Sequence, residues 1–113
     1  MEFSSYVKDD MLVITPLEEN LDAKNTSVFK EEILNLLQST GILKVIIDLT
    51  NLQFIDSSGL GVLLSLQRHL HSQKGALKLA HLNKPIRTMF EIVSMHRVLE
   101  IFPTLDEALQ SFS

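Results

Sequence analysis

Short uninterrupted runs of apolar residues alternate along this chain with longer stretches in which apolar residues recur every three or four positions. Apolar runs bounded by turn residues are typical of β-strands, and the three-to-four spacing is typical of amphipathic helices. The pattern predicts strands at residues 3–8, 11–14, 43–49, 76–81 and 98–102. It predicts helices over about 23–39 and 57–73, from 83 onward and from 105 onward. Strands alternating with helices predict an α/β fold with a largely parallel sheet, in which the first two strands can be antiparallel.

The strands differ in how fully they should be covered. The run at residues 43–49 lacks polar alternation, so we expect it at the centre of the sheet. Pro16 cannot donate a ladder hydrogen bond and should end the second strand, after a turn at Asp9 and Asp10 between the first two strands. Residues 17–22 are expected to form a loop.

Each helix is expected to bury one face. In the first helix this face holds Phe29, Ile33, Leu36 and Leu37. In the second it holds Leu60, Leu63, Leu64, Gln67, Leu70 and His71, widened by Val62 and Leu66. In the third it holds Ile86, Met89, Phe90 and Val93, and in the last Leu105, Ala108, Leu109 and Phe112. Gly41 and Gly75 are placed to end the first two helices, and Thr104 with Glu107 forms a capping box before the last.

One segment combines an acid, two hydroxyls and two glycines with apolar residues on both sides. It runs from Phe54 and Ile55, which we expect to be buried, through Asp56, Ser57, Ser58, Gly59, Leu60 and Gly61. Acidic and hydroxyl residues are preferred at helix N-caps, where their oxygens accept hydrogen bonds from unpaired N–H groups. A serine here is either a plain cap or an exposed hydroxyl at the positive end of a helix dipole.

Size and charge limit the possible functions. The 113 residues suit a single domain over 1–113, and the chain has no cysteine, hence no disulfide or thiolate metal site. No signal peptide and no apolar stretch of about 20 residues is present, so we expect a cytoplasmic protein that does not enter membranes. The net charge of −4, with no run of basic residues, argues against nucleic acid as a partner.

The residues from Asp56 to Gly61 resemble the signature of STAS domains, in particular that of the bacterial anti-sigma factor antagonists. The predicted order of strands and helices over nearly the whole chain is also that of a STAS domain. This resemblance implies a mixed, largely parallel sheet with about four helices packed mainly on one face. The match is partial elsewhere: Leu21 and Asp22 resemble the family's Gly-Glu-Leu-Asp. The family's Gly-Leu after the third helix is replaced by Met95 and His96, so that helix should end differently, because Met95 would be strained in a left-handed cap.

The resemblance also implies a function. In the antagonists the hydroxyl directly after the aspartate is phosphorylated, which corresponds to Ser57 and, less favourably, Ser58. An anti-sigma factor that is also a serine kinase would bind the unmodified surface formed by Asp22 and residues 56–61, thereby freeing its sigma factor. Phosphorylation of Ser57 would end this binding and a phosphatase would restore it. Nucleotide and magnesium would belong to the kinase, and no cofactor is expected on this chain.

The sequence favours other functions less strongly. STAS domains also serve as constitutive interaction modules in signalling or transport assemblies, in which Ser57 would only cap a helix. An enzyme would need a histidine beside a serine nucleophile, and no Gly-x-Ser-x-Gly elbow is present. A metal site is disfavoured, because His69 and His71 point to different faces of a helix while His81 and His96 are isolated.

Overall fold

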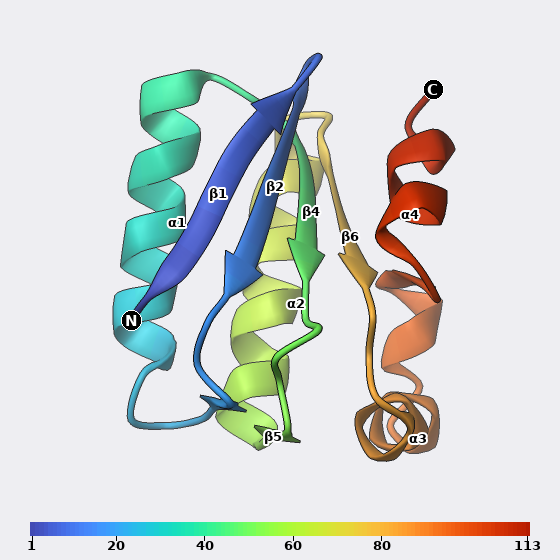
Figure 1. The fold of residues 1–113 in the computed structure, drawn as a ribbon. Coiled ribbons are helices and arrows are strands. Elements are labelled where there is room, and N and C mark those ends of the chain that lie inside the picture. Colours follow the sequence, from blue (N-terminus) through green and yellow to red (C-terminus); the bar gives the residue numbers. More distant parts are fainter.

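The structure, a computed structural model, describes all residues 1–113. Its main sheet has five strands in the order β1-β2-β4-β6-β7 (Figure 1). The strands are β1 (Phe3–Lys8), β2 (Met11–Pro16), β4 (Lys44–Asp48), β6 (Ala76–Ala80) and β7 (Glu100–Phe102). Only β1 and β2 are antiparallel, and every other neighbouring pair is parallel. The predicted fold class, a mixed and largely parallel α/β sheet, is confirmed.

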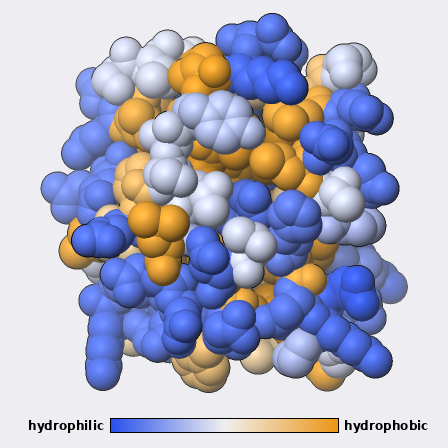
Figure 2. Space-filling model, viewed as in Figure 1, coloured by the Kyte–Doolittle hydropathy of each residue, from blue (hydrophilic) through white to orange (hydrophobic).

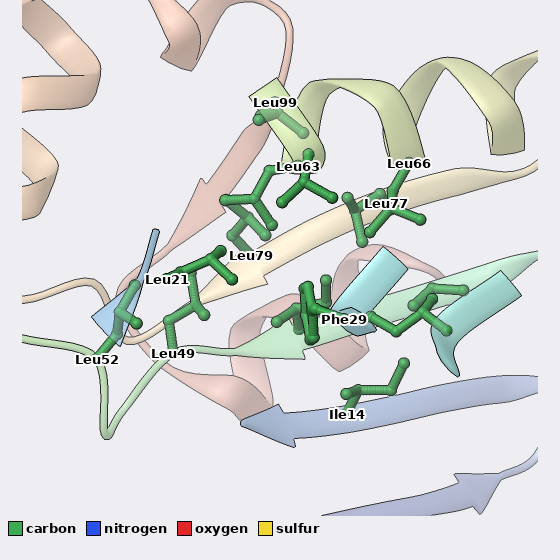
Figure 3. Close-up of a cluster of buried hydrophobic side chains, with 14 of the residues drawn as sticks. Ile14, Leu21, Phe29, Leu49, Leu52, Leu63, Leu66, Leu77, Leu79 and Leu99 are labelled. Atoms are coloured by element: carbon green, nitrogen blue, oxygen red, sulfur yellow. The ribbon is translucent and has the colours of Figure 1, made fainter. Parts of the chain in front are cut away.

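Three helices cover one face of the sheet and one helix covers the other. The elements α1 (Thr26–Thr40), α2 (Ser57–Ser72) and α3 (Lys84–Ile92) share one apolar cluster with the strands, part of which Figure 3 shows. The last helix, α4 (Leu105–Ser111), packs on the opposite face in a second cluster with Met11, Val13 and Ile46. In Figure 1, α2 lies behind the strands and α4 stands beside β6. The prediction of helices mainly on one face is confirmed.

The central strand is β4, as predicted. The consecutive β4 residues Ile46 and Ile47 belong to the two different clusters, and both are fully buried. Covered faces on both sides explain why this strand has no polar alternation. At the far end of the sheet the β1–β2 turn places Asp10 2.8 Å from the amine of Lys44. That hydrogen bond holds the pKa of the Asp10 carboxyl below its ordinary value.

The buried face of α2 is rotated from the predicted one. The buried residues are Gly59, Val62, Leu63, Leu66 and Leu70. Leu60 is half-buried and packs against this core, but Leu64 is half-buried outside it and His71 is exposed, so placing Leu64 and His71 on the central stripe was wrong. The reason is that the glycine in the first turn allows a close approach between the helix and a neighbouring segment of the chain. Apolar spacing alone does not reveal where this approach occurs. Gln67 is half-buried, and its amide is hydrogen-bonded to Leu77 and Val98.

The ends of two helices differ from the predicted ends or were not predicted from the sequence. After α2 the left-handed residue is Lys74, with φ of +66°, rather than Gly75. Gly75 is needed for a different reason, because a Cβ there would lie 2.4 Å from the carbonyl oxygen of Leu43. After α3 the left-handed residue is Ser94, at φ of +60°, and a 3₁₀ turn, η1 (Met95–Arg97), follows. Met95 therefore escapes the strain that we expected in a left-handed cap.

The remaining helix ends are closer to prediction. Gly41 ends α1 in a left-handed conformation and donates its N–H to Leu37. Thr104 caps α4 by accepting from the N–H of Glu107 at 3.1 Å, while the reciprocal bond of a capping box is absent. None of the helices is both long enough and apolar enough to cross a bilayer.

Candidate functional site

A second, two-stranded sheet builds the site. The short strands β3 (Asn20–Leu21) and β5 (Phe54–Ile55) pair in parallel, with Leu21 opposite Ile55 and both buried. Residues 17–22 were expected to form a loop only, so β3 corrects that prediction. Beyond this pair, the N–H of Asp56 donates to the carbonyl of Leu21, and the carboxylate of Asp56 accepts from the N–H of Ala23. Asp56 is thus bonded to the residues on both sides of Asp22, although 34 positions separate the two acids in the chain.

Asp56 joins two parts of the backbone. Its main chain is extended, with φ of −106° and ψ of −173°, and one carboxylate oxygen accepts from the N–H of Gly59 at 2.9 Å. The other oxygen accepts from the N–H of Ala23 at 3.1 Å, and the N–H of Asp56 donates to the carbonyl of Leu21. The carboxylate therefore caps α2 and also fixes the loop between β3 and α1, in agreement with the preference of aspartate for N-caps.

Because Asp56 is the cap, the serines are not. Ser57 and Ser58 form the first two residues of α2, both are exposed, and neither hydroxyl forms a hydrogen bond with another group of the protein. The interpretation of Ser57 as a plain cap is wrong. A free hydroxyl at the positive end of a sixteen-residue helix is open to a phosphoryl donor and lies in a field that favours an added negative charge.

Asp22 is engaged in its own loop. Its carboxylate accepts from the N–H of Lys24 at 2.9 Å, and its N–H donates to the side chain of Asn25 at 3.0 Å. The amide of Asn25 also donates to the carbonyl of Asn20 at 2.7 Å. Asn25 occupies the N-cap position of α1 without capping it, because its side chain closes this loop instead. The loop therefore presents a fixed shape next to Asp56.

The two glycines of the motif have different surroundings. A Cβ at Gly59 would lie 2.4 Å from the carbonyl oxygen of Leu21 and 2.5 Å from a side-chain carbon of Ile55. A Cβ at Gly61 would meet nothing within 4 Å. Gly59 is therefore required where α2 crosses β3, whereas Gly61 is exposed and required by nothing inside the molecule. Leu60, between them, is half-buried against the main core.

Further surface residues adjoin the motif that sequence reasoning missed. Phe54 was expected to be buried, but it is 51% exposed, because it and Ile55 point to opposite sides of β5 and only Ile55 faces the core. A shallow groove of about 250 Å³ lies between α1 and α2. It is lined by Thr26, Ser27, Lys30, Gly61, Val62 and Ser65. No apolar periodicity marks these residues, and they come together only through helix packing.

The histidines do not form a metal site. No group of three or more histidine, aspartate or glutamate side chains is placed to hold an ion. His81 is not isolated as expected, because its Nδ1 lies 2.9 Å from a carboxylate oxygen of Asp48. That pair ties together the carboxyl ends of β4 and β6.

Comparison with known proteins agrees with this geometry. The STAS domain family model matches residues 3–108. A candidate anti-sigma factor antagonist from Thermotoga maritima is 25% identical over 96% of this chain and 95% of its own. An anti-sigma F factor antagonist from Paenibacillus polymyxa is 24% identical over 87% of this chain and 84% of its own.

Solved structures show the same fold. A crystal structure of a candidate anti-sigma factor antagonist from Thermotoga maritima superposes with a TM-score of 0.90, covering 96% of this chain and 92% of that chain at 25% identity. The antagonist SpoIIAA in its unphosphorylated form gives a TM-score of 0.80 at 21% identity over 98% of this chain and 96% of that one. Its phosphorylated form gives 0.73 at 22% identity over 99% and 100%. This chain belongs to the STAS domain family.

Proposed function

We propose that this protein is an anti-sigma factor antagonist regulated by phosphorylation on Ser57. In its unmodified form it binds an anti-sigma factor serine kinase, and the sigma factor held by that kinase is released. The observation that carries the proposal is the state of the first turn of α2. The carboxylate of Asp56 caps α2 by accepting from the N–H of Gly59, and the adjacent Ser57 hydroxyl is left exposed and unbonded.

The binding surface follows from this geometry. We place the kinase over Asp22, Asp56, Ser57, Ser58 and the exposed backbone at Gly61. These residues are set by the β3–β5 pairing and by the loop bonds of Asp22, so the surface is formed before a partner arrives. A preformed surface loses little conformational entropy on binding, which favours affinity.

A phosphate on Ser57 would act on the partner rather than on the fold. It brings a charge of about −1.5 to −2 and three acceptor oxygens. The N-terminus of α2 favours that charge, while Asp56 and Asp22 oppose it. A docked partner would have to bury the charge, and disrupting a buried polar contact costs about 2–5 kcal/mol. This corresponds to a roughly 30-fold to few-thousand-fold loss of affinity.

The rest of the cycle needs partners with their own chemistry. The side-chain hydrogen bonds of His69 and His81 go to Gln73 and Asp48 and not to either serine. We propose a binding protein rather than an enzyme, acting in the cytoplasm and without nucleic acid. The kinase supplies the nucleotide and magnesium, and a phosphatase returns Ser57 to the binding form. Both serine hydroxyls are exposed and unbonded, so the choice of Ser57 over Ser58 rests on its position directly after Asp56, as in the family.

The proposal is tested by intact-mass analysis after incubation with candidate anti-sigma factor kinases and ATP. We expect one added phosphate on the wild type and on Ser58→Ala, and none on Ser57→Ala. Retention of the phosphate in Ser57→Ala would move the acceptor to Ser58 or elsewhere. Tight binding to another partner with no phosphorylation by any kinase would favour a constitutive interaction module.

A further inference from the structure

A second cavity lies away from the serines, at the edge of the sheet formed by β7. It has a volume of about 440 Å³, within the range of small-molecule sites. Leu82 follows the carboxyl end of β6, and Pro103 follows that of β7. Ligands of α/β sheets usually bind at the carboxyl ends of parallel strands. In the view of Figure 2 hydrophilic side chains dominate the lower part of the molecule, the part in which Figure 1 shows α3.

The cavity has one apolar side and one charged side. Leu82 and Ile101 supply apolar surface beside the main core and are half-buried, whereas the side chain of Phe102 packs on the other face of the sheet, against the cluster that contains α4. The charged side comes from α3 and η1, which contribute Arg87 and Glu91 together with His96. The residues come from three separate segments of the chain, so no sequence motif announces them.

The charged groups are left without partners inside the protein. Arg87 and Glu91 are one helical turn apart on α3, the spacing at which opposite charges often pair. They form no ion pair here, and each is exposed at the cavity. Each charged side chain is therefore free to bind an external group of opposite charge. A guanidinium is suited to two parallel hydrogen bonds with a carboxylate, and a carboxylate accepts well from an ammonium group.

We propose that this cavity binds a free amino acid with an apolar side chain. The α-carboxylate would lie on Arg87, with the His96 imidazole as a second donor, and the α-ammonium would lie on Glu91. The side chain would occupy the surface of Leu82 and Ile101. A zwitterion satisfies both unpaired charges at once, whereas a simple organic acid would leave its own carboxylate facing that of Glu91.

The test is a titration of the whole protein with L-phenylalanine and L-leucine, followed by amide nuclear magnetic resonance shifts. We expect saturable shifts confined to residues 82, 87–96 and 101–103, with a Kd on the order of 1 mM, as suits a small ligand in an open site. Two analogues isolate the charges, since 3-phenylpropionate lacks the ammonium group and phenethylamine lacks the carboxylate. Each should bind at least about tenfold more weakly than L-phenylalanine, and glycine should not bind measurably.

Substitutions show which protein side chain binds which charged group of the ligand. Arg87→Gln should weaken L-phenylalanine at least about tenfold, which is the loss of one charge-assisted contact. Glu91→Gln should weaken L-phenylalanine and leave 3-phenylpropionate unchanged or improved. Lys84→Gln is the matched control, because Lys84 is an exposed cation on the same helix that does not line the cavity. All three positions are on the surface, so a preserved amide spectrum confirms the fold.

Two results would overturn the proposal. One is the absence of saturable shifts at this cavity with either amino acid. The other is equal affinity for L-phenylalanine and 3-phenylpropionate, unaffected by Glu91→Gln, which would remove the role of the ammonium group. The proposal does not depend on phosphorylation of Ser57, so either claim can fail without the other.

Discussion

The inner and outer sides of the first turn of α2 differ in almost every respect. On the inner side Asp56 bonds to two backbone N–H groups, and Gly59 is in contact with β3. On the outer side Ser57, Ser58 and Gly61 are exposed and make no such contacts. A motif of six consecutive residues therefore contains two sets with separate purposes. One set holds the fold, and the other is exposed on the surface where we propose that a partner binds.

Gly59→Ala should have the largest effect on stability. The added methyl group would collide with the backbone carbonyl of Leu21, which belongs to the β3–β5 pair and cannot turn away as a flexible side chain could. Overpacking of this kind costs about 1–3 kcal/mol, and we expect a value near the upper end. Urea denaturation would measure the loss. An unchanged midpoint would show that α2 can move away from β3.

Asp56→Ala should come next. The substitution removes the N-cap of α2 and the bond to Ala23, and we expect the free energy of unfolding to fall by about 1–2 kcal/mol. Asp56→Asn is the control, since an amide oxygen can still accept from Gly59. It should retain a large part of the stability, and equal loss in both variants would argue that charge rather than capping matters here.

Gly61→Ala should have a smaller effect of opposite sign. Alanine in a helix is more stable than glycine by about 0.5–1 kcal/mol, and its Cβ would enter open space at this position. Thermal unfolding should therefore occur at a higher temperature than in the wild type. A lower unfolding temperature would mean that a side chain at Gly61 destabilises the fold, as we expect at Gly59.

The smallest effects should come from the serines. Ser57→Ala and Ser58→Ala remove hydroxyls that form no hydrogen bond within the protein, so the free energy of unfolding should change by no more than about 0.5 kcal/mol. Loss of more than about 1 kcal/mol from Ser57→Ala, measured by the same urea titration, would return that residue to a capping role.

Much of this arrangement could be predicted from the sequence. Apolar runs and helical spacing, together with turn and capping residues, placed the five strands of the main sheet and the four helices. A strand or buried turn ending at Asp56 was also expected, where β5 lies, but β3 was not, since a strand of two residues has no period. The exposed position of Phe54 depends on the pairing of these two strands. The resemblance of the motif pointed to Asp22 and Asp56, and the pairing of β3 with β5 explains why the segments that carry them lie side by side.

Other features depend on packing between distant segments. Lys78 alternates with Leu77 and Leu79 as a solvent-facing residue would, yet it is only 7% exposed. The last helix covers it, and its amine donates to the carbonyl and hydroxyl oxygens of Ser111 and lies 4.1 Å from the ring centre of Phe112. The alternation of apolar and polar residues in β6 does not reveal which face of the sheet α4 covers. Hence neither the burial of Lys78 nor the cavity beside β7 could be foreseen.

We propose that the outer side of this turn controls binding without controlling the fold. The most direct test compares the protein before and after phosphorylation on Ser57, measuring both its affinity for the phosphorylating kinase and its free energy of unfolding. We predict a loss of affinity of roughly 30-fold or more, with the free energy of unfolding changed by less than about 1 kcal/mol. Unchanged affinity, or a loss of binding that only follows unfolding of the domain, would contradict the claim.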